Sequence, residues 1–471
     1  MSERPDDTLE VDPAAKPEES LEPAHDDVDA AVITALDTGD TAGLKELVDG
    51  LHYADVADIV ERLSADRREQ LITEIGPDMA PDVLAELDES VREEIFEAMA
   101  PEQIAAHVQE LDSDDAVEIV HQMEAPEQQK VLDAMSAPDR RLIEQSLSYP
   151  EESAGRLMQR EIVTVPTHWT VGQTIDFMRQ AAEGDDDILP DSFYDIFVVD
   201  PTHKPVGSIH LSHLLRAKRP VKVSDIMETE LKLISVNMDQ EDVAFLFRQR
   251  DLVSAPVVDE AQRLVGAITI DDVVDVIHEE HEEDMLALAG VGEDDLYDAA
   301  IDTTKARFRW LLVNLFTAIL ASLVIGLFAT TLEQIVALAI LMPIVASMGG
   351  NAGTQTLTVA VRAMAMRELT ATNAYRVIGK EVLVGTINGV LFAVITGAIA
   401  WFWFGQPQIG LIIGLAMIIN MVVAGLAGAA IPLVLDRFGI DPAIASSVFL
   451  TTVTDVVGFF AFLGLAALFL L

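Results

Sequence analysis

The apolar positions of the first third of the chain follow a regular repeat. Two series of apolar residues each recur every 24 residues. The first series is Leu71, Ile95, Ile119 and Ile143, and the second is Leu63, Leu87, Leu111 and Met135. Members of the second series are followed by short polar turns. Repeats of this length, each with two short amphipathic helices, predict an α-solenoid over residues 30–150. Residues 1–29 are polar and acidic, and we expect a disordered tail there.

Between residues 151 and 280 the pattern changes to short β-branched runs followed by helical segments. The runs at 196–200 and 206–209 return 59 residues later, at 255–259 and 265–268. Runs that end at Asp or Gly turns are typical of β-α units. This region resembles a tandem pair of CBS domains, at about 157–217 and 225–280. The first copy carries an acidic insertion near 184–192.

The chain after residue 306 is mainly apolar. Its long stretches are each long enough to cross a bilayer, which requires about 20 residues, and they are 308–328, 334–361, 378–404, 409–435 and 443–471. All eight Lys and Arg residues from position 301 onward lie before or at the start of the first stretch, between the second and third stretches or at the start of the third, or between the fourth and fifth. By the positive-inside rule, the soluble region is cytosolic and the C-terminus lies outside, in a multi-pass inner-membrane protein.

Charge separates the two halves and limits the chemistry. Residues 1–300 carry 22 Lys and Arg against 72 Asp and Glu, whereas residues 301–471 carry 8 against 7. The chain has no Cys, and all ten His precede residue 282, so the membrane region offers only oxygen to a metal. Oxygen ligands suit Mg²⁺ and not Zn²⁺ or Cu²⁺. We see no catalytic constellation and expect neither an enzyme nor a nucleic-acid partner. The acidity also fits salt-in halophilic adaptation.

Two of the apolar stretches contain polar residues at membrane depth. The last has Asp455, flanked by Thr451 and Thr454. A carboxylate there costs several kcal/mol unless it faces protein, water or a cation, so Asp455 is a candidate ion site. The alternative is an acid that only pairs with a neighbouring helix.

The second apolar stretch is predicted to be irregular, because Pro343 interrupts it. After Pro343 come two glycines and several polar residues, and they are Gly349, Gly350, Asn351, Thr354 and Gln355. We favour a pore-lining segment over a plain packing face of small residues.

A helix loaded with acids precedes the membrane region. Residues 271–284 place carboxylates on several helical faces, and like charges at this spacing repel one another. Divalent ions that bridge the helix to a neighbour would relieve this repulsion. The alternative is a solvated charged helix. We expect the rest of the connection to the membrane at 281–305.

Taken together, these features resemble the MgtE family of magnesium channels and transporters, with residues 349–355 and 452–455 as the membrane motifs. The resemblance implies a homodimer in lipid, with the pore on the dimer axis. It implies that Asp455 binds hydrated Mg²⁺ and that Asn351 lies on the pore side. Ser447 stands where the family has Asn or Gly, and Val448 where it has Pro.

The resemblance also implies that cytosolic Mg²⁺ regulates the pore through acids of the second CBS unit, the connecting helix and the start of the last span. By position these sensor acids are Asp239, Glu241, Asp251, Asp272, Asp275, Glu280, Glu283, Asp284 and Asp441. Asp272 also occupies the position where many CBS pairs hold the ribose of a nucleotide such as ATP, although it could simply cap the next helix.

The resulting interpretation is a multidomain protein: an α-solenoid, an α/β CBS pair and an all-α membrane domain of five helices at 306–471. We expect a Mg²⁺ channel closed by cytosolic Mg²⁺. One alternative is a secondary transporter that exchanges Mg²⁺, Co²⁺ or Mn²⁺ for Na⁺ or H⁺. The other is a nucleotide-sensing CBS protein with a membrane anchor.

Overall fold

The computed structural model describes residues 25–76, 79–182, 189–190, 192–291, 300–370 and 372–471. These form two compact units, one of residues up to 237 with 256–267, and one of 238–255 with 268–471. Most of the expected acidic tail and most of the acidic insertion, residues 1–24, 183–188 and 191, lie outside the described part. Residues 25–29 were expected in the tail, but helix α1 begins at His25.

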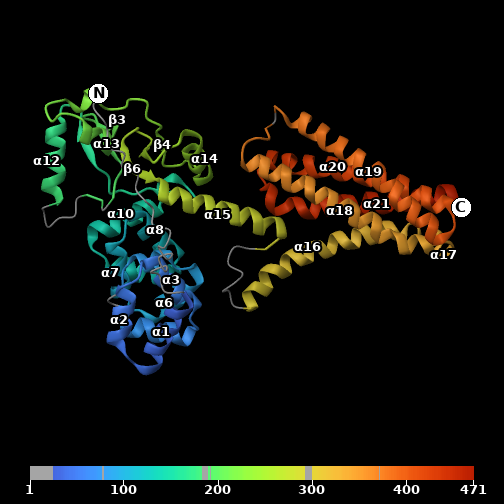
Figure 1. Cartoon of the computed structure of the whole chain (residues 1–471), viewed down its shortest axis with the longest axis horizontal. Coiled ribbons are helices and arrows are strands. Elements are labelled where there is room, and N and C mark those ends of the chain that lie inside the picture. The colour runs from blue at the N-terminus through green and yellow to red at the C-terminus, as the bar shows by residue number, and fades with distance from the viewer. Residues whose placement is uncertain (1–24, 77–78, 183–188, 191, 292–299, 371) are drawn as a thin grey trace, which may run out of the picture. The chain divides into compact units, whose positions relative to one another are not determined.

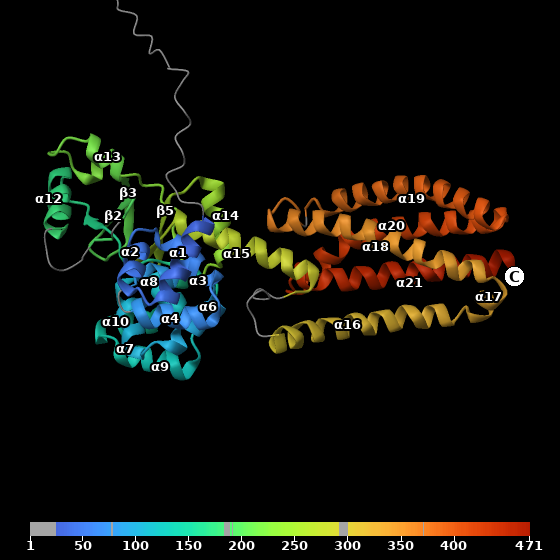
Figure 2. The ribbon, with the colours of Figure 1, turned by 60° about the horizontal axis from the view of Figure 1, so that its bottom comes forward.

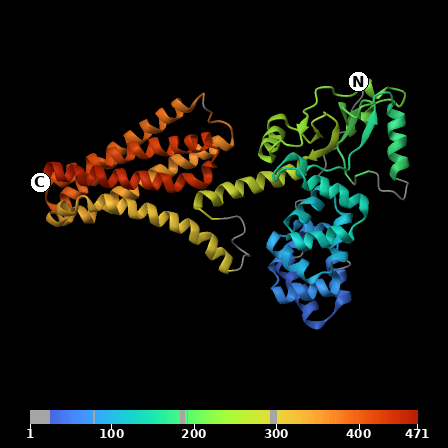
Figure 3. The same cartoon turned by 180° about the vertical axis from the view of Figure 1, so that it is seen from behind.

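The first unit begins with a stack of short helices, blue to teal in Figure 3. They are α1 (His25–Thr38), α2 (Thr41–Asp49), α3 (Tyr53–Arg62), α4 (Ala65–Ile75), α5 (Asp82–Glu86), α6 (Glu89–Ala98), α7 (Pro101–Glu110), α8 (Ser113–Gln122), α9 (Ala125–Ala134) and α10 (Ala137–Leu147). Seven of the eight repeating apolar residues are buried in one continuous core, and Leu111 packs partly buried against it. The 24-residue spacing therefore marks the buried face, and the predicted helical N domain is confirmed.

The CBS pair forms two small three-stranded sheets. The first contains β1 (Thr164–Pro166), β2 (Asp195–Val199) and β3 (Pro205–His210), and the second contains β4 (Ile234–Ser235), β5 (Ser254–Val258) and β6 (Leu264–Thr269). The helices of this region are α11 (Ala154–Leu157), α12 (Val171–Ala182), α13 (Leu211–Arg216) and α14 (Gln240–Arg250). In both sheets the first strand pairs parallel with the second, which confirms the predicted repeat.

The two CBS copies complete each other by a reciprocal contact. Gln159, beside Met158 at the start of the first copy, exchanges backbone hydrogen bonds with Ala267 of the second. Glu228, beside Met227 at the start of the second copy, exchanges them with Ser208 of the first. A glycine precedes Ser208 and another precedes Ala267, because a larger residue would not fit at either position. A Cβ at Gly207 would lie 2.7 Å from the Met227 sulfur, and one at Gly266 would lie 2.8 Å from the Met158 sulfur.

The second unit contains a bundle of long helices (Figure 1 and Figure 2). They are α15 (Ile270–Ala289), α16 (Ala300–Gly326), the short α17 (Ala329–Gln334), α18 (Val336–Ala365), α19 (Ala374–Phe404), α20 (Pro407–Arg437) and α21 (Pro442–Leu470). Among the described residues, five helices are long and apolar enough to span a membrane: α16, α18, α19, α20 and α21. The predicted spans are thus confirmed in number and order, with ends shifted by a few residues.

Close helix packing in the bundle depends on small residues. A Cβ at Gly385 of α19 would lie 2.5 Å from the Met421 carbonyl oxygen of α20, so the two backbones meet there. α20 packs against α18, α19 and α21 and supplies much of the buried core. In Figure 2, α16 runs beside α21 at the edge of the bundle.

One expectation about local structure is wrong. The second span is not irregular, because α18 continues through Pro343 without a break. A proline removes only one backbone donor, and neighbouring helices can compensate for that loss in a membrane bundle. The acidic helix expected at 271–284 is present as α15, which follows β6 directly and ends at Ala289.

Candidate ion pathway and acidic pocket

The last span presents a polar face. Ser447, Thr451 and Asp455 recur every four residues of α21 and so lie on one side of the helix. Thr451 is exposed in the single chain, and Ser447 and Asp455 are partly exposed. Thr454 was expected to join them, but it is fully buried and its hydroxyl donates to the Leu450 carbonyl of its own helix at 3.0 Å. Thr454 therefore belongs to the packing face.

The second span divides its motif between two faces. Asn351, Thr354 and Gln355 are exposed and lie on one side of α18. A Cβ at Gly350 would meet no other atom within 4 Å. Gly349 was also expected at the pore, but it is buried on the opposite face of the helix. The double glycine therefore serves packing at its first position and leaves open space at its second.

The polar faces of α18 and α21 belong to helices in direct contact. A Cβ at Gly353 of α18 would lie 2.8 Å from a methyl carbon of Leu450 on α21. We call the set Asn351, Thr354, Gln355, Thr451 and Asp455 the polar strip. It lies on two otherwise apolar helices, where polar groups are costly unless protein, water or an ion meets them.

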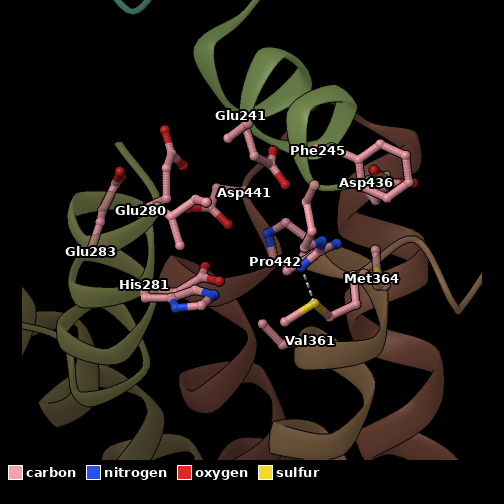
Figure 4. Close-up of a pocket in the computed structure, with 16 residues that line it drawn as sticks. Glu241, Phe245, Glu280, His281, Glu283, Val361, Met364, Asp436, Asp441 and Pro442 are labelled. Carbon is pink, nitrogen blue, oxygen red and sulfur yellow. Dashed lines mark hydrogen bonds between the residues drawn. The ribbon is translucent and has the colours of Figure 1, made fainter. Parts of the chain in front are cut away.

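A pocket of about 270 Å³ lies among α14, α15, the end of α18, the end of α20 and the start of α21. Figure 4 shows acids that face it from several of these helices. Its carboxylates among the described residues are Glu241, Glu280, Glu283, Asp284, Asp436 and Asp441. Five of them were predicted as sensor acids. Asp436 was missed, because beside Arg437 it reads as an ordinary helix end.

The pocket acids are held in place and crowd one another. Asp441 caps α21 by accepting a hydrogen bond from the Ala443 amide at 2.7 Å, and Glu280 accepts one from the Gln240 side chain at 3.0 Å. Burial, and then the charge of Asp441, raises the pKa of Asp284. Burial, and then the charge of Glu280, raises the pKa of Glu241. A proton or a cation in the pocket would relieve this repulsion.

The acids of the pocket are not clustered closely around one point. In the part of the chain that the structure describes, no three His, Asp or Glu side chains are gathered closely enough to hold one metal ion. Mg²⁺ gives up its water reluctantly, and carboxylates often contact it through that water. Acids spaced around a pocket can still contact an ion through its water shell.

The other four predicted sensor acids lie outside the pocket lining. Asp239 accepts a hydrogen bond from the Glu241 amide at 3.0 Å and begins α14, and Asp251 ends α14 with a left-handed φ of 53°. Asp275 is exposed. Asp272 accepts from the Thr269 hydroxyl at 2.8 Å in a capping box, and burial raises its pKa to about 6. Asp272 thus acts as a helix cap, which was the alternative weighed against a ribose contact.

The loop after α18 is fastened to α14. The Phe245 ring lies 4.4 Å from the Arg367 guanidinium and 5.4 Å from that of Arg248. Arg367 also pairs with Asp242, and Arg248 donates to the Met366 sulfur at 2.7 Å, drawn as a dashed line in Figure 4. We call Asp242, Phe245, Arg248 and Arg367 the arginine clamp. Sequence reasoning did not find it, because Arg367 lies more than 110 residues after the other three members in the chain.

A second acid within a span was also missed. Glu381 of α19 is only 11% exposed at its side chain and lies 3.5 Å from the Lys380 nitrogen. It accepts a hydrogen bond from the Thr356 hydroxyl of α18 at 3.3 Å. The signal was present in the sequence, since the expected third span contained this Lys–Glu pair.

Comparison with known proteins accounts for these parts together. Residues 342–465 match the MgtE family, described as a divalent cation transporter, and residues 51–152 match the MgtE intracellular N domain. Residues 154–219 and 223–279 each match the CBS domain. A Thermus thermophilus protein named magnesium transporter MgtE is 32% identical over 443 residues, which covers 93% of this chain and 97% of that one. The chain belongs to the MgtE family of magnesium transporters.

Two further MgtE proteins are similar to the chain. The magnesium transporter MgtE of Bacillus subtilis is 27% identical over 447 residues, with 95% of this chain and 98% of that one covered. A solved structure described as the cytosolic domain of the Mg²⁺ channel MgtE in complex with ATP is 31% identical, covers 53% of this chain and 99% of its own, and has a TM-score of 0.49. Membership makes the chain a multi-pass membrane protein that transports Mg²⁺ and is no enzyme.

Proposed function

We propose that the chain forms a homodimeric Mg²⁺ channel whose pore is lined by the polar strip. The observation that carries the proposal is the position of Asn351 and Asp455, which lie on the exposed polar faces of two apolar spans whose helices are in contact. A polar face turned toward lipid would be costly, and a second copy could cover it. Homodimers usually have a two-fold axis, which would bring two Asp455 carboxylates to one pathway.

The ligands suit the ion. Carboxylate, hydroxyl and amide oxygens of the polar strip can hydrogen-bond to the water shell of Mg²⁺, which the ion gives up reluctantly. Two carboxylates would balance the charge of one Mg²⁺ without a rigid cage around it. The Lys and Arg residues of the membrane region fall on one side of the five spans, so we place the soluble domains in the cytosol and the C-terminus outside.

Regulation by cytosolic Mg²⁺ is the second part of the proposal. In the acidic pocket, Glu241 of α14 and Glu280 and Asp284 of α15 lie with Asp441, which begins the proposed pore helix α21. Mg²⁺ that neutralises these acids would hold α14 and α15 against α21, and its loss would let them repel. Sensing would thereby act on a helix of the polar strip.

Flux measurements test the pore. We expect Asp455→Asn to reduce Mg²⁺ uptake into liposomes by roughly a hundredfold or more, because a neutral amide cannot compensate the ion's charge. Glu333→Gln is the matched control, because it removes an exposed acid on α17 that lies outside the polar strip and the pocket. Near-normal uptake by a folded Asp455→Asn protein would refute the pore assignment.

The two rival functions predict different results in the same liposomes. A secondary transporter would need a Na⁺ or H⁺ gradient and would show no single-channel currents, whereas a channel would show them. A nucleotide sensor with a membrane anchor would give no Mg²⁺ flux at all. ATP binding at the CBS pair stays a prediction, which titration of the purified protein with ATP would check.

A further inference from the structure

Asn420 is a polar residue in the most buried part of the membrane domain. It lies in the middle of α20 and is 0% exposed. Its amide nitrogen donates to the Val345 carbonyl oxygen of α18 at 2.8 Å. Its amide oxygen has no hydrogen-bond partner among the described residues. Burying an amide that is only half satisfied is unfavourable, so its position needs an explanation beyond packing.

Two glycines provide the space for this amide. A Cβ at Gly349 of α18 would overlap the amide nitrogen and lie 2.7 Å from the amide carbon of Asn420. A Cβ at Gly458 of α21 would lie 2.8 Å from the nitrogen and 3.1 Å from the same carbon. The shortest distance from each added carbon to the Asn420 amide is below the usual contact distance of a Cβ atom. Alanine therefore fits at neither Gly349 nor Gly458 unless the Asn420 side chain or a helix moves. The Asn420 side chain is therefore wedged between α18 and α21.

The Asn420 side chain, which we call the wedge, contacts α18 and α21 close to residues of the polar strip. Gly349 is two residues before Asn351, and Gly458 is three residues after Asp455. Each glycine is thus within one helical turn of the residue that the proposed pore depends on. The contacts of Asn420 with both helices limit how far either can slide or rotate against the other.

We propose that Asn420 is a positioning residue for the ion pathway. It sets the register of α18 against α21, and so places Asn351 and Asp455, without touching the ion itself. An apolar side chain could fill the same space, but it would lack the directed bond to Val345 that selects one register. This inference rests on the proposed pore function.

A pair of substitutions separates positioning from stability. Asn420→Ala removes the buried amide and its unpaired oxygen, so we expect a folded protein with an unchanged or higher unfolding temperature. Loss of the wedge should nonetheless lower Mg²⁺ uptake per folded protein by about tenfold, since small displacements of a binding site have large effects. The preference for Mg²⁺ over Ca²⁺ should also fall, which a purely structural role would not cause.

A double-mutant cycle tests the contact itself. Gly349→Ala should lower the unfolding temperature in the wild-type background, because its methyl group meets the Asn420 amide. The same change in the Asn420→Ala background should cost much less. Thr396→Ala serves as the matched control, because this buried hydroxyl bonds to the Phe392 carbonyl of its own helix α19. We expect it to leave uptake and ion preference unchanged.

The outcomes distinguish this inference from the pore proposal. Unchanged uptake and unchanged ion preference in Asn420→Ala would show that Asn420 only packs, and the inference would fall. Additive effects of Gly349→Ala and Asn420→Ala on the unfolding temperature would also overturn it. Normal uptake in Asp455→Asn would instead refute the pore, and the cycle on unfolding temperature would still report the contact.

Discussion

At the scale of single residues, acids of this chain differ according to what surrounds them. Asp239 and Asp441 each accept a hydrogen bond from a backbone amide, and each lies at the start of a helix. Glu241 and Asp284 face other acids in the pocket, and burial first, then neighbouring charge, raises the pKa of each. Asp455 lies in an apolar helix. The same side chain thus caps a helix, repels a neighbour or offers charge to an ion.

The capping acid Asp272 gives a pH prediction. Burial raises its pKa in the folded protein to about 6, from an ordinary 3.8. The protonated form is therefore favoured by folding, and this stabilisation is present below about pH 4 and lost as the pH rises through 6. Asp272→Asn should stabilise the protein at pH 7 by on the order of 1 kcal/mol, since its amide oxygen can still accept from Thr269.

The measurement is the unfolding temperature of the full chain in detergent between about pH 4 and pH 7. The difference between wild type and Asp272→Asn should shrink as the pH falls. Glu333→Gln, an exposed change on α17, should keep the wild-type pH dependence. A difference that is the same at every pH would show that ionisation of Asp272 is not the cause.

At the scale of elements, two helices outside the membrane reach different spans. α15 contacts α21, and α14 is fastened by the arginine clamp to the loop that follows α18. Arg367 holds a left-handed φ of 55°, a conformation uncommon for residues other than glycine. The clamp therefore fixes a strained loop, and any movement of α14 would pull on the end of α18.

Removing the clamp should weaken regulation without blocking the pore. Phe245→Ala removes the ring between Arg248 and Arg367, a contact worth roughly 1 kcal/mol, so half-closure should need about fivefold more Mg²⁺. Maximal uptake at low cytosolic Mg²⁺ should stay at the wild-type level. Arg376→Gln, on α19 outside the clamp, is the control. An unchanged half-closing concentration would mean that α14 does not act through this contact.

At the scale of the whole molecule, charge is distributed very unevenly. The region before residue 301 is strongly acidic, whereas the membrane region is almost neutral. Cations in the cytosol will therefore gather around the soluble domains whether or not they bind at one site. Specific sensing must be separated from this general attraction.

Limited proteolysis across a Mg²⁺ titration makes that separation. The wild-type protein should become resistant to cleavage within residues 1–300 at millimolar Mg²⁺, because bridged acids hold α14 and α15 in place. Replacing Glu280, Glu283 and Asp284 with Gln, Gln and Asn should remove the response. Replacing the exposed Glu93, Glu97 and Glu102 of the N domain should not. Equal losses in both triple variants would attribute the effect to general charge screening.

The sequence predicted the architecture better than the site. A 24-residue period, a repeated β-α pattern and five long apolar stretches each constrain where elements lie, because the burial of many residues depends on them. The direction that one side chain faces depends on its partners. Thr454 and Gly349 therefore fell on the packing side, and Asn420 attracted no notice within an apolar stretch. Asp436 joined the pocket only because α20 ends beside α14.

The reciprocal contact of the CBS copies has a consequence for how this region can be divided. Each copy begins with a segment that forms backbone hydrogen bonds with the sheet of the other copy. The methionine of that segment packs against a glycine of the same sheet. A single copy made alone would expose an unpaired strand edge and an empty notch at its glycine, which favours aggregation. The two halves carry matching edges, so separately expressed fragments divided between the copies should recombine when mixed.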